Sequence, residues 1–262
     1  MPPFPGTCLL GRDREKDDQD DFYYKWLTRL GSRNYWQVDK RMYHADDICI
    51  AQTYLYLYEK YKQKDMIVPT LARTEWVVAN PPSGSFQLTY GDATTLEHWT
   101  WCDALFMAPP VYLKLYNITG DKKFIRFMDK EYKATYEFLF DKEENLFYRD
   151  HRYFDMKESN GAKVFWGRGN GWVLGGLVEM LRELPAKSNI VRSIRNCFRN
   201  SVTASLIYKV TTGSGVQVCS IRTLIHHPKQ AVAVSSYMPC LWTERGTLPK
   251  EKFLPVVEKG WK

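Results

Sequence analysis

Apolar residues recur at three- and four-residue steps along most of the first 190 residues, the spacing that predicts amphipathic helices. In residues 46–61, Ile48, Ala51 and Leu55 fall on one helical face, and Asp46 stands where an N-cap is expected. The alternating pattern typical of strands is nearly absent before residue 190. The sequence therefore predicts an all-α protein.

Helix boundaries are marked by capping residues later in the chain. Gly120 can end one helix and Asp121 can cap the next, because glycine tolerates a left-handed backbone and aspartate accepts from free N–H groups. Residues 170–184 and 249–261 are further predicted helices, the second with Pro249 suited to a first helical turn.

Two predicted helical hairpins share a pattern. Residues 57–58 and 66–67 match 115–116 and 124–125 in kind, each pair at the same offset of 58 residues. A repeat of this size, holding two helices and two turns, predicts stacked α-hairpins. Both an open solenoid and a closed α/α toroid fit this pattern.

Composition places the chain among ordinary globular proteins. It has 262 residues, of which 44% are hydrophobic and 26% charged, which excludes intrinsic disorder and collagen-like repeats. No apolar run approaches the ~20 residues of a membrane span, so no membrane partner is expected. The start lacks the apolar stretch of a secretory signal, which predicts the cytoplasm by default and leaves the periplasm open. Oligomeric state is not encoded in these features.

The net charge of +7 comes from one segment. Residues 191–240 hold six basic residues and no Asp or Glu. Their apolar residues show neither helical nor clear strand periodicity. The rest of the chain is nearly neutral, so a nucleic-acid partner is not expected. The aromatic content of 15% instead suggests a site where rings stack on a ligand.

Asp103 is the first candidate for chemistry. It is a lone carboxylate in an apolar and aromatic stretch that begins with Trp99 and Trp101. Burial beside indole rings disfavours the ionised form and raises the pKa, as a general acid requires. The alternative is an N-cap for the helix that contains Pro109 and Pro110, and residue types alone favour neither.

A second candidate is the glycine-rich stretch of residues 165–172. It places two Trp, an Arg and an Asn around an open turn, and Arg can bind a carboxylate through two hydrogen bonds. This composition suits an acidic sugar, whereas a helix N-terminus with packed Trp is the structural alternative. Neither a dinucleotide-binding fingerprint nor a phosphate-binding P-loop is present.

Two charged motifs have simpler interpretations. Residues 43–47 place a His beside two adjacent carboxylates at a helix start, where capping and dipole charges are the favoured interpretation. Residues 147–155 place Arg, Asp and His after an aromatic pair, where a solvated charged loop is favoured. The six Cys include no C-x-x-C pair, so no metal site is predicted, and without a secretory signal their even number does not imply disulfides.

In this order, the motifs Y-H-A-D-D, W-x-W-C-D-A-L-F-M-A-x-P, T-G-D-K-K-F and W-x-R-G-N-G-W resemble the unsaturated rhamnogalacturonyl hydrolases of glycoside hydrolase family 105. That family is related to the unsaturated glucuronyl hydrolases of family 88. The resemblance spans residues 22–184 and 248–262. It implies an (α/α)6 barrel, here a single domain over 1–262 that is incomplete at both ends, with an atypical start at 1–21.

The resemblance also implies an activity. The family removes 4,5-unsaturated galacturonic acid from pectin fragments, with an Asp that protonates the double bond and then serves as base for water. That Asp corresponds to Asp103, and the second carboxylate falls on Asp46 or Asp47, a choice that stays open. No metal or organic cofactor is implied. The substrate-binding residues expected from the motifs and the resemblance are His44, Asp46, Asp47, Trp101, Arg149, His151, Trp166, Arg168, Asn170 and Trp172.

The segment 191–240 departs from the family pattern. Synonymous codon choices for this segment would allow a family motif in another reading frame. We therefore hypothesise that it is encoded out of frame, which sequencing of the gene would test. A chain with such a segment is expected to have weak or no activity. The competing functions are a related α/α-toroid enzyme acting on another uronic-acid oligosaccharide and a non-catalytic remnant.

Overall fold

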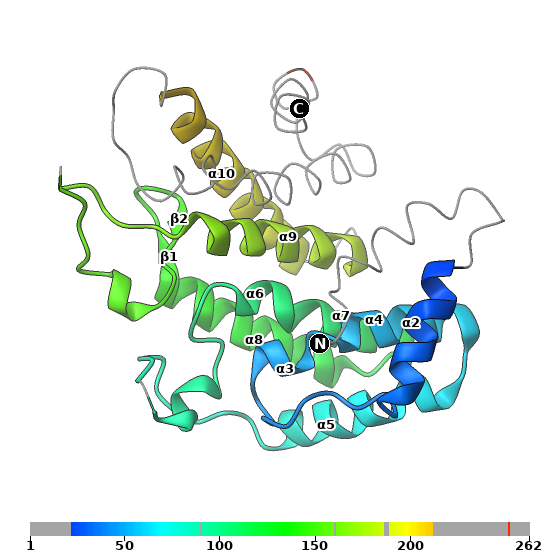
Figure 1. Cartoon of the computed structure of the whole chain (residues 1–262). Helices are drawn as coiled ribbons and strands as arrows, with labels where there is room; N and C mark the ends of the chain where they lie inside the picture. The colour runs from blue at the N-terminus through cyan, green and yellow to red at the C-terminus, as the bar shows by residue number, and fades with distance from the viewer. Residues whose placement is uncertain (1–21, 90, 160, 186–188, 212–250, 252–262) are drawn as a thin grey trace.

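The computed structural model describes residues 22–89, 91–159, 161–185, 189–211 and 251, and helices dominate it (Figure 1). Short 3-10 turns occur at Lys64–Met66 (η1), Ala93–Leu96 (η2) and His151–Tyr153 (η3). The helices are α2 (Phe22–Arg33), α3 (Ala45–Ile48), α4 (Ala51–Tyr61), α5 (Val68–Ala79), α6 (Ala104–Met107), α7 (Pro109–Thr119), α8 (Lys122–Leu139), α9 (Gly167–Glu183) and α10 (Asn189–Thr211).

The predicted all-α class is confirmed, with one small addition. Strands β1 (Phe140–Asp141) and β2 (Leu146–Phe147) form an antiparallel hairpin directly after α8. Its turn is built by Asp141, whose carboxylate accepts hydrogen bonds from the backbone N–H groups of Glu143 and Glu144. Two-residue strands leave no alternating pattern, which is why the sequence did not show them.

The predicted 58-residue repeat is visible in the helices themselves. Helices α4, α7 and α9 begin at residues 51, 109 and 167, and α4 and α7 end at residues 61 and 119. Gly120 follows α7 with φ of +74°, and Asp121 accepts from the backbone N–H of Lys123, so both predicted caps are confirmed. Lys62 takes the position of Gly120 in the first hairpin, also with a left-handed φ of +55°.

The single helix predicted over 46–61 is divided in two. Asp46 lies inside α3, whose N-cap is His44, so the prediction of Asp46 as an N-cap is wrong. The neighbouring carboxylate of Asp47 accepts from the backbone N–H and the guanidinium of Arg41, which fixes how the chain enters α3. A break at residues 49–50 separates this short turn from α4.

The core lies where α4, α6, α7 and α9 meet. Leu55, Leu105 and Leu115 are completely buried there, together with other side chains of the same helices. Gly176 brings α9 against the backbone of α6, because a Cβ at this position would lie 2.1 Å from the carbonyl oxygen of Leu105. This close approach sets α6, and the residues just before it, against the first turns of α9.

The expectation of a segment without helical periodicity from residue 191 is wrong for residues 191–211. Helix α10 covers them and packs on α9, with Val191, Ile194, Phe198 and Val202 buried (Figure 1). These residues follow the three- and four-residue steps of a helix, and the arginines between them do not interrupt that spacing. The rest of the anomalous segment, 212–240, and all of the helix predicted over 249–261 except residue 251 lie outside the described residues.

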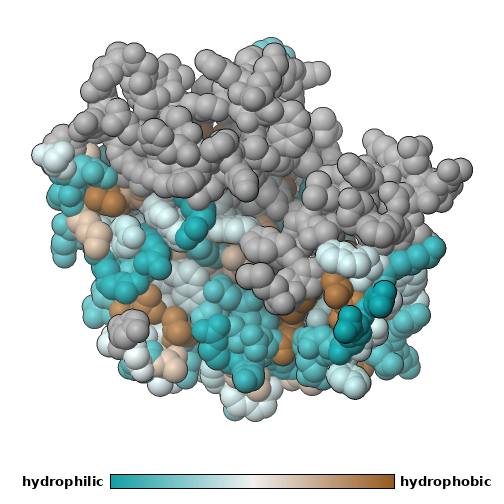
Figure 2. Space-filling view, viewed as in Figure 1, coloured by the Kyte–Doolittle hydropathy of each residue, from teal (hydrophilic) through white to brown (hydrophobic). Residues whose placement is uncertain are grey.

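The described surface is polar over much of the face in Figure 2, with apolar residues in small separate groups. Within the ranges given above, no helix combines the length and the apolar character needed to cross a membrane.

Candidate active site

Asp103 stands immediately before α6, and it does not cap a helix with its side chain. Its carboxylate makes no hydrogen bond to the first turn of α6, and the helix with Pro109 and Pro110 at its start is α7, one element later. The capping alternative is therefore wrong. The carboxylate is left for other contacts at a position that is only partly exposed.

The environment of Asp103 favours its protonated form. Burial raises the pKa of this carboxyl to about 6, and the negative charge of Asp46 adds to the increase. A hydrogen bond from the Cys102 thiol, with Sγ 3.4 Å from Oδ1, acts in the opposite direction, as do the positive charges of Arg168 and Arg149. A carboxyl with this pKa holds a proton in mildly acidic solution and can donate it near neutral pH.

The first turn of α9 approaches Asp103 closely because residue 169 is a glycine. A Cβ on Gly169 would lie 2.5 Å from Cys102 Sγ, 2.7 Å from the Trp166 ring and 3.0 Å from Asp103 Oδ1. Even the smallest side chain would thus overlap its neighbours. The glycine-rich stretch serves to bring a Trp and an Arg beside the carboxyl.

Two arginines converge on the Trp166 ring. The guanidinium carbon of Arg168 lies 4.3 Å from the ring centroid, and that of Arg149 lies 5.2 Å away. Cation–π attraction holds planar guanidinium groups at such distances. In the part of the chain that the structure describes, no carboxylate forms an ion pair with Arg168. This surface is cationic and aromatic, which suits a sugar that carries a carboxylate.

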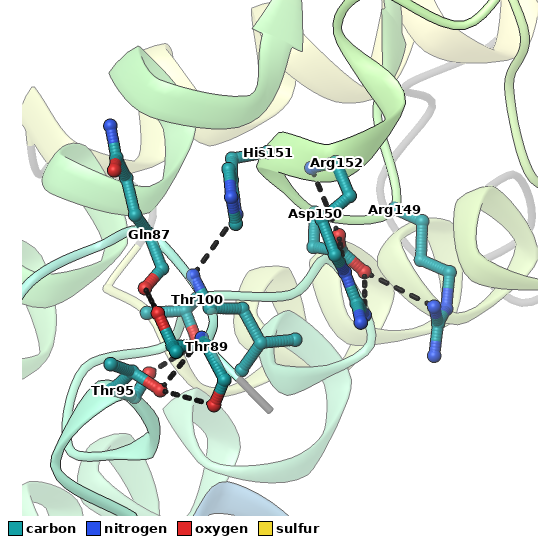
Figure 3. Close-up of polar contacts among 9 residues, drawn as sticks. Gln87, Thr89, Thr95, Thr100, Arg149, Asp150, His151 and Arg152 are labelled. Atoms are coloured by element: carbon teal, nitrogen blue, oxygen red, sulfur yellow. Dashed lines mark hydrogen bonds and ion pairs between the residues drawn. The ribbon is translucent and has the colours of Figure 1, made fainter. Parts of the chain in front are cut away.

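Asp150 holds the Arg149 side chain in place through an ion pair. Its carboxylate is completely buried and forms ion pairs with Arg149 Nη1 at 3.1 Å and with Arg152 Nε at 2.7 Å (Figure 3). Burial alone would raise the pKa of Asp150, but the hydrogen bonds from Arg152 and both positive charges hold it below its usual value. The expectation of a solvated charged loop is therefore wrong for Asp150, whereas Arg152 and Asp155 of the same loop are exposed.

The two adjacent carboxylates of α3 differ sharply. Asp47 is buried, and the Arg41 guanidinium and backbone N–H lower its pKa more than burial raises it. Asp46 is exposed, yet partial desolvation by the surrounding protein raises its pKa. The negative charge of Asp46 in turn raises the pKa of Asp103. Buried His44 lies beside them, with its ring centroid 4.9 Å from that of Trp101.

The chain matches the family model described as Glycosyl Hydrolase Family 88 over residues 14–262. The chain belongs to glycosyl hydrolase family 88. This result confirms the resemblance carried by the motifs, which pointed to family 105 and its relative family 88.

Two curated proteins named unsaturated 3S-rhamnoglycuronyl hydrolase are similar to this family 88 chain. The one from Alteromonas sp. (strain LOR) is 36% identical over 182 residues, covering 66% of this chain and 44% of its own length. The one from Formosa agariphila is 34% identical over 278 residues, covering 98% and 71%. A solved family 88 protein from Bacteroides vulgatus has the same fold, with a TM-score of 0.74 at 20% identity over 92% of this chain and 71% of its own. The chain thus spans less than half of the first relative.

Several predicted substrate-binding residues of this family 88 chain also make contacts within the protein. The amide of Asn170 accepts from the Phe147 N–H at 2.8 Å and donates to the Phe147 carbonyl at 2.9 Å, so it joins α9 to β2. His151 Nδ1 accepts from the Leu88 N–H at 3.0 Å (Figure 3). The Trp172 ring packs against Phe106, with centroids 4.7 Å apart. These side chains hold the site together.

Sequence reasoning missed three residues of the site. No local pattern indicates that the buried Cys102 thiol contacts Asp103, that Asp150 is buried beside two arginines, or that Gly169 lets α9 approach closely. Only contacts between distant segments reveal their roles, as in the backbone hydrogen bond from Cys102 N–H to the Arg149 carbonyl at 2.9 Å. Among the described residues, no group of three or more His, Cys, Asp and Glu side chains is placed to hold a metal ion.

Proposed function

We propose that the chain is a glycosidase that removes a 4,5-unsaturated uronic acid from the non-reducing end of a rhamnose-containing oligosaccharide. The observation that carries this proposal is Asp103, a carboxyl with a pKa of about 6 beside a Trp and two arginines. Membership of family 88 and the names of the two relatives support the same substrate class.

The proposed reaction begins with the proton on Asp103. It passes to C4 of the C4=C5 double bond, where the ring oxygen stabilises positive charge that develops at C5. Water then adds at C5, and the Asp103 carboxylate accepts a proton from it. The resulting hemiketal opens to a ketone at C5 and a hemiacetal at C1. The C1–O bond to rhamnose then breaks, rhamnose takes the proton of the hemiacetal hydroxyl, and C1 becomes an aldehyde. One water is consumed, and Asp103 ends the cycle protonated.

The neighbouring residues suit the binding of this substrate. The Trp166 face can stack on the apolar face of the sugar ring, while Arg168 and Arg149 can bind the carboxylate at C5. Asp46 is accessible and its charge raises the pKa of Asp103, so it is a better candidate for the second carboxylate than ion-paired Asp47. Asp46 can accept from a sugar hydroxyl or from the attacking water.

The uronic acid itself has two candidates. The pectin context expected from the motifs gives galacturonic acid, whereas the relatives' names contain rhamnoglycuronyl, which also admits glucuronic acid. The test follows loss of the double-bond ultraviolet absorbance with unsaturated galacturonosyl-rhamnose and with unsaturated glucuronosyl-rhamnose, each with and without a sulfate ester on rhamnose. Loss of absorbance with one of them, abolished in Asp103→Asn, is the expected result. Turnover of none, or turnover that persists in the variant, contradicts the proposal.

A further inference from the structure

The thiol of Cys102 lies against the carboxyl of Asp103. Its Sγ is 3.4 Å from Asp103 Oδ1, within hydrogen-bonding distance for sulfur, and the residue is completely buried. The backbone N–H of Cys102 donates to the carbonyl of Arg149, so the backbone that carries the thiol is anchored to the neighbouring loop. The backbone that carries the thiol is therefore held in place, and the Asp103 carboxyl lies beside the sulfur as a hydrogen-bond acceptor.

Helix α9 closes the remaining space around this thiol. A Cβ on Gly169 would come within 2.5 Å of Sγ and 3.0 Å of Asp103 Oδ1, so the sulfur and the carboxyl oxygen share one tightly packed location. Because packing restricts the sulfur, its weak donor group is held near Oδ1.

We infer that Cys102 is a positioning residue, whose S–H donates to Asp103 and sets how firmly the proposed acid holds its proton. The inference rests on the proposed function, since it concerns the same carboxyl. Burial raises the pKa of the Cys102 thiol well above its usual value, so the thiol stays protonated and remains a donor throughout the working pH range.

Charged groups from three neighbouring segments also act on Asp103. Asp46 from α3 raises its pKa, while Arg168 from α9 and Arg149 from the loop after β2 lower it. After burial itself, the hydrogen bond from Cys102 is the largest influence. Changing the thiol should therefore move the titration of Asp103 without changing any charge.

The experiment compares Cys102→Ala, which removes the donor, with Cys102→Ser, which supplies a stronger one. We expect the pH above which kcat/KM falls to rise by roughly half a unit in the Ala variant, because the ionised form loses a hydrogen bond, and to fall in the Ser variant. Cys197→Ala is the matched control: Cys197 is also buried, but it lies in α10, and its loss should not move this limb.

A second measurement needs no turnover. The Asp103 carboxyl pKa is followed by ¹³C NMR in aspartate-labelled protein, with Asp103→Asn assigning the signal. Opposite shifts in the Ala and Ser variants support the inference, even if the wild-type protein turns over none of the four disaccharides and the proposed function fails. An unmoved carboxyl pKa overturns the inference. Activity lowered equally at every pH, with no shift of the limb, also overturns it by showing a packing role alone.

Discussion

Asp103 and Asp150 lie in two neighbouring segments, share Arg149 as a neighbour, and have opposite pKa shifts. Asp150 is completely buried, but direct ion pairs with Arg149 and Arg152 keep its pKa low. Asp103 is less buried, yet its pKa rises to about 6. Within the described ranges, Arg149 and Arg168 approach Asp103 without forming an ion pair with it.

The comparison teaches that burial alone does not decide protonation. A direct, charge-assisted hydrogen bond to a carboxylate lowers its pKa more than desolvation raises it, whereas a cation without direct contact only reduces the increase in pKa. The same arginine thus stabilises a permanent charge at Asp150 and leaves a transferable proton at Asp103. One carboxylate holds the loop in place, and the other is available for chemistry.

The largest expected effect is the fall in kcat when the proposed proton donor is removed. Asp103→Asn keeps the shape and removes the acid, so we expect kcat to fall roughly a thousandfold, within the range typical of general acids. The assay is loss of the double-bond absorbance on the disaccharide that the wild type turns over. Circular dichroism serves as the control for an intact fold. Residual activity above a tenth of wild type would show that another group donates the proton.

Removal of the other carboxylate should act on stability instead. Asp150→Asn leaves two arginines without their partner, and we expect a loss of about 3 kcal/mol in urea unfolding at pH 7, since the arginines are partly exposed. Because the folded pKa is depressed, this contribution is present above about pH 4 and disappears as pH falls through the folded value. Exposed Asp155→Asn in the same loop is the control, and an equal loss there would refute the assignment.

The sign of the stability change should reverse at Asp103. A folded pKa of about 6 against an ordinary value of 3.8 means that proton binding stabilises the fold at low pH, and that this stability is lost as pH rises through 6. Asp103→Asn should therefore stabilise the protein at pH 7, by at most about 3 kcal/mol, with no gain at pH 3.5 or below. Urea titrations at the two pH values measure this, and destabilisation at pH 7 would contradict the raised pKa.

The sequence predicts the scaffold better than the site. The 58-residue spacing and the caps at Gly120 and Asp121 are local patterns, and the structure confirms them because each helix buries one face. Helix α10 has the same apolar spacing at Val191, Ile194 and Phe198, although the unusual charge composition of residues 191–240 does not suggest a helix. Composition is a weaker guide to local structure than periodicity.

The site depends on contacts that no local pattern encodes. Adjacent Asp46 and Asp47 are equivalent in the sequence, and they are distinguished by burial and by the hydrogen bonds from Arg41 to Asp47. Likewise, burial of Asp150 requires two flanking arginines to fold inward around it. A lone carboxylate among aromatic residues, by contrast, is a local pattern, and it makes Asp103 a candidate acid before any contact is known.

The smallest expected effect concerns Arg149, the residue that the two regions share. Arg149→Ala removes a positive charge that lowers the pKa of Asp103. The pH above which kcat/KM falls should therefore rise by a few tenths of a unit. Arg152→Ala is the matched control, because Arg152 binds Asp150 but is not among the charges that shift Asp103. Both variants should lose some stability, since each leaves Asp150 with one partner. If the limb moves equally in both, Arg149 acts only through the loop, and the two carboxylates are not tuned by a common charge.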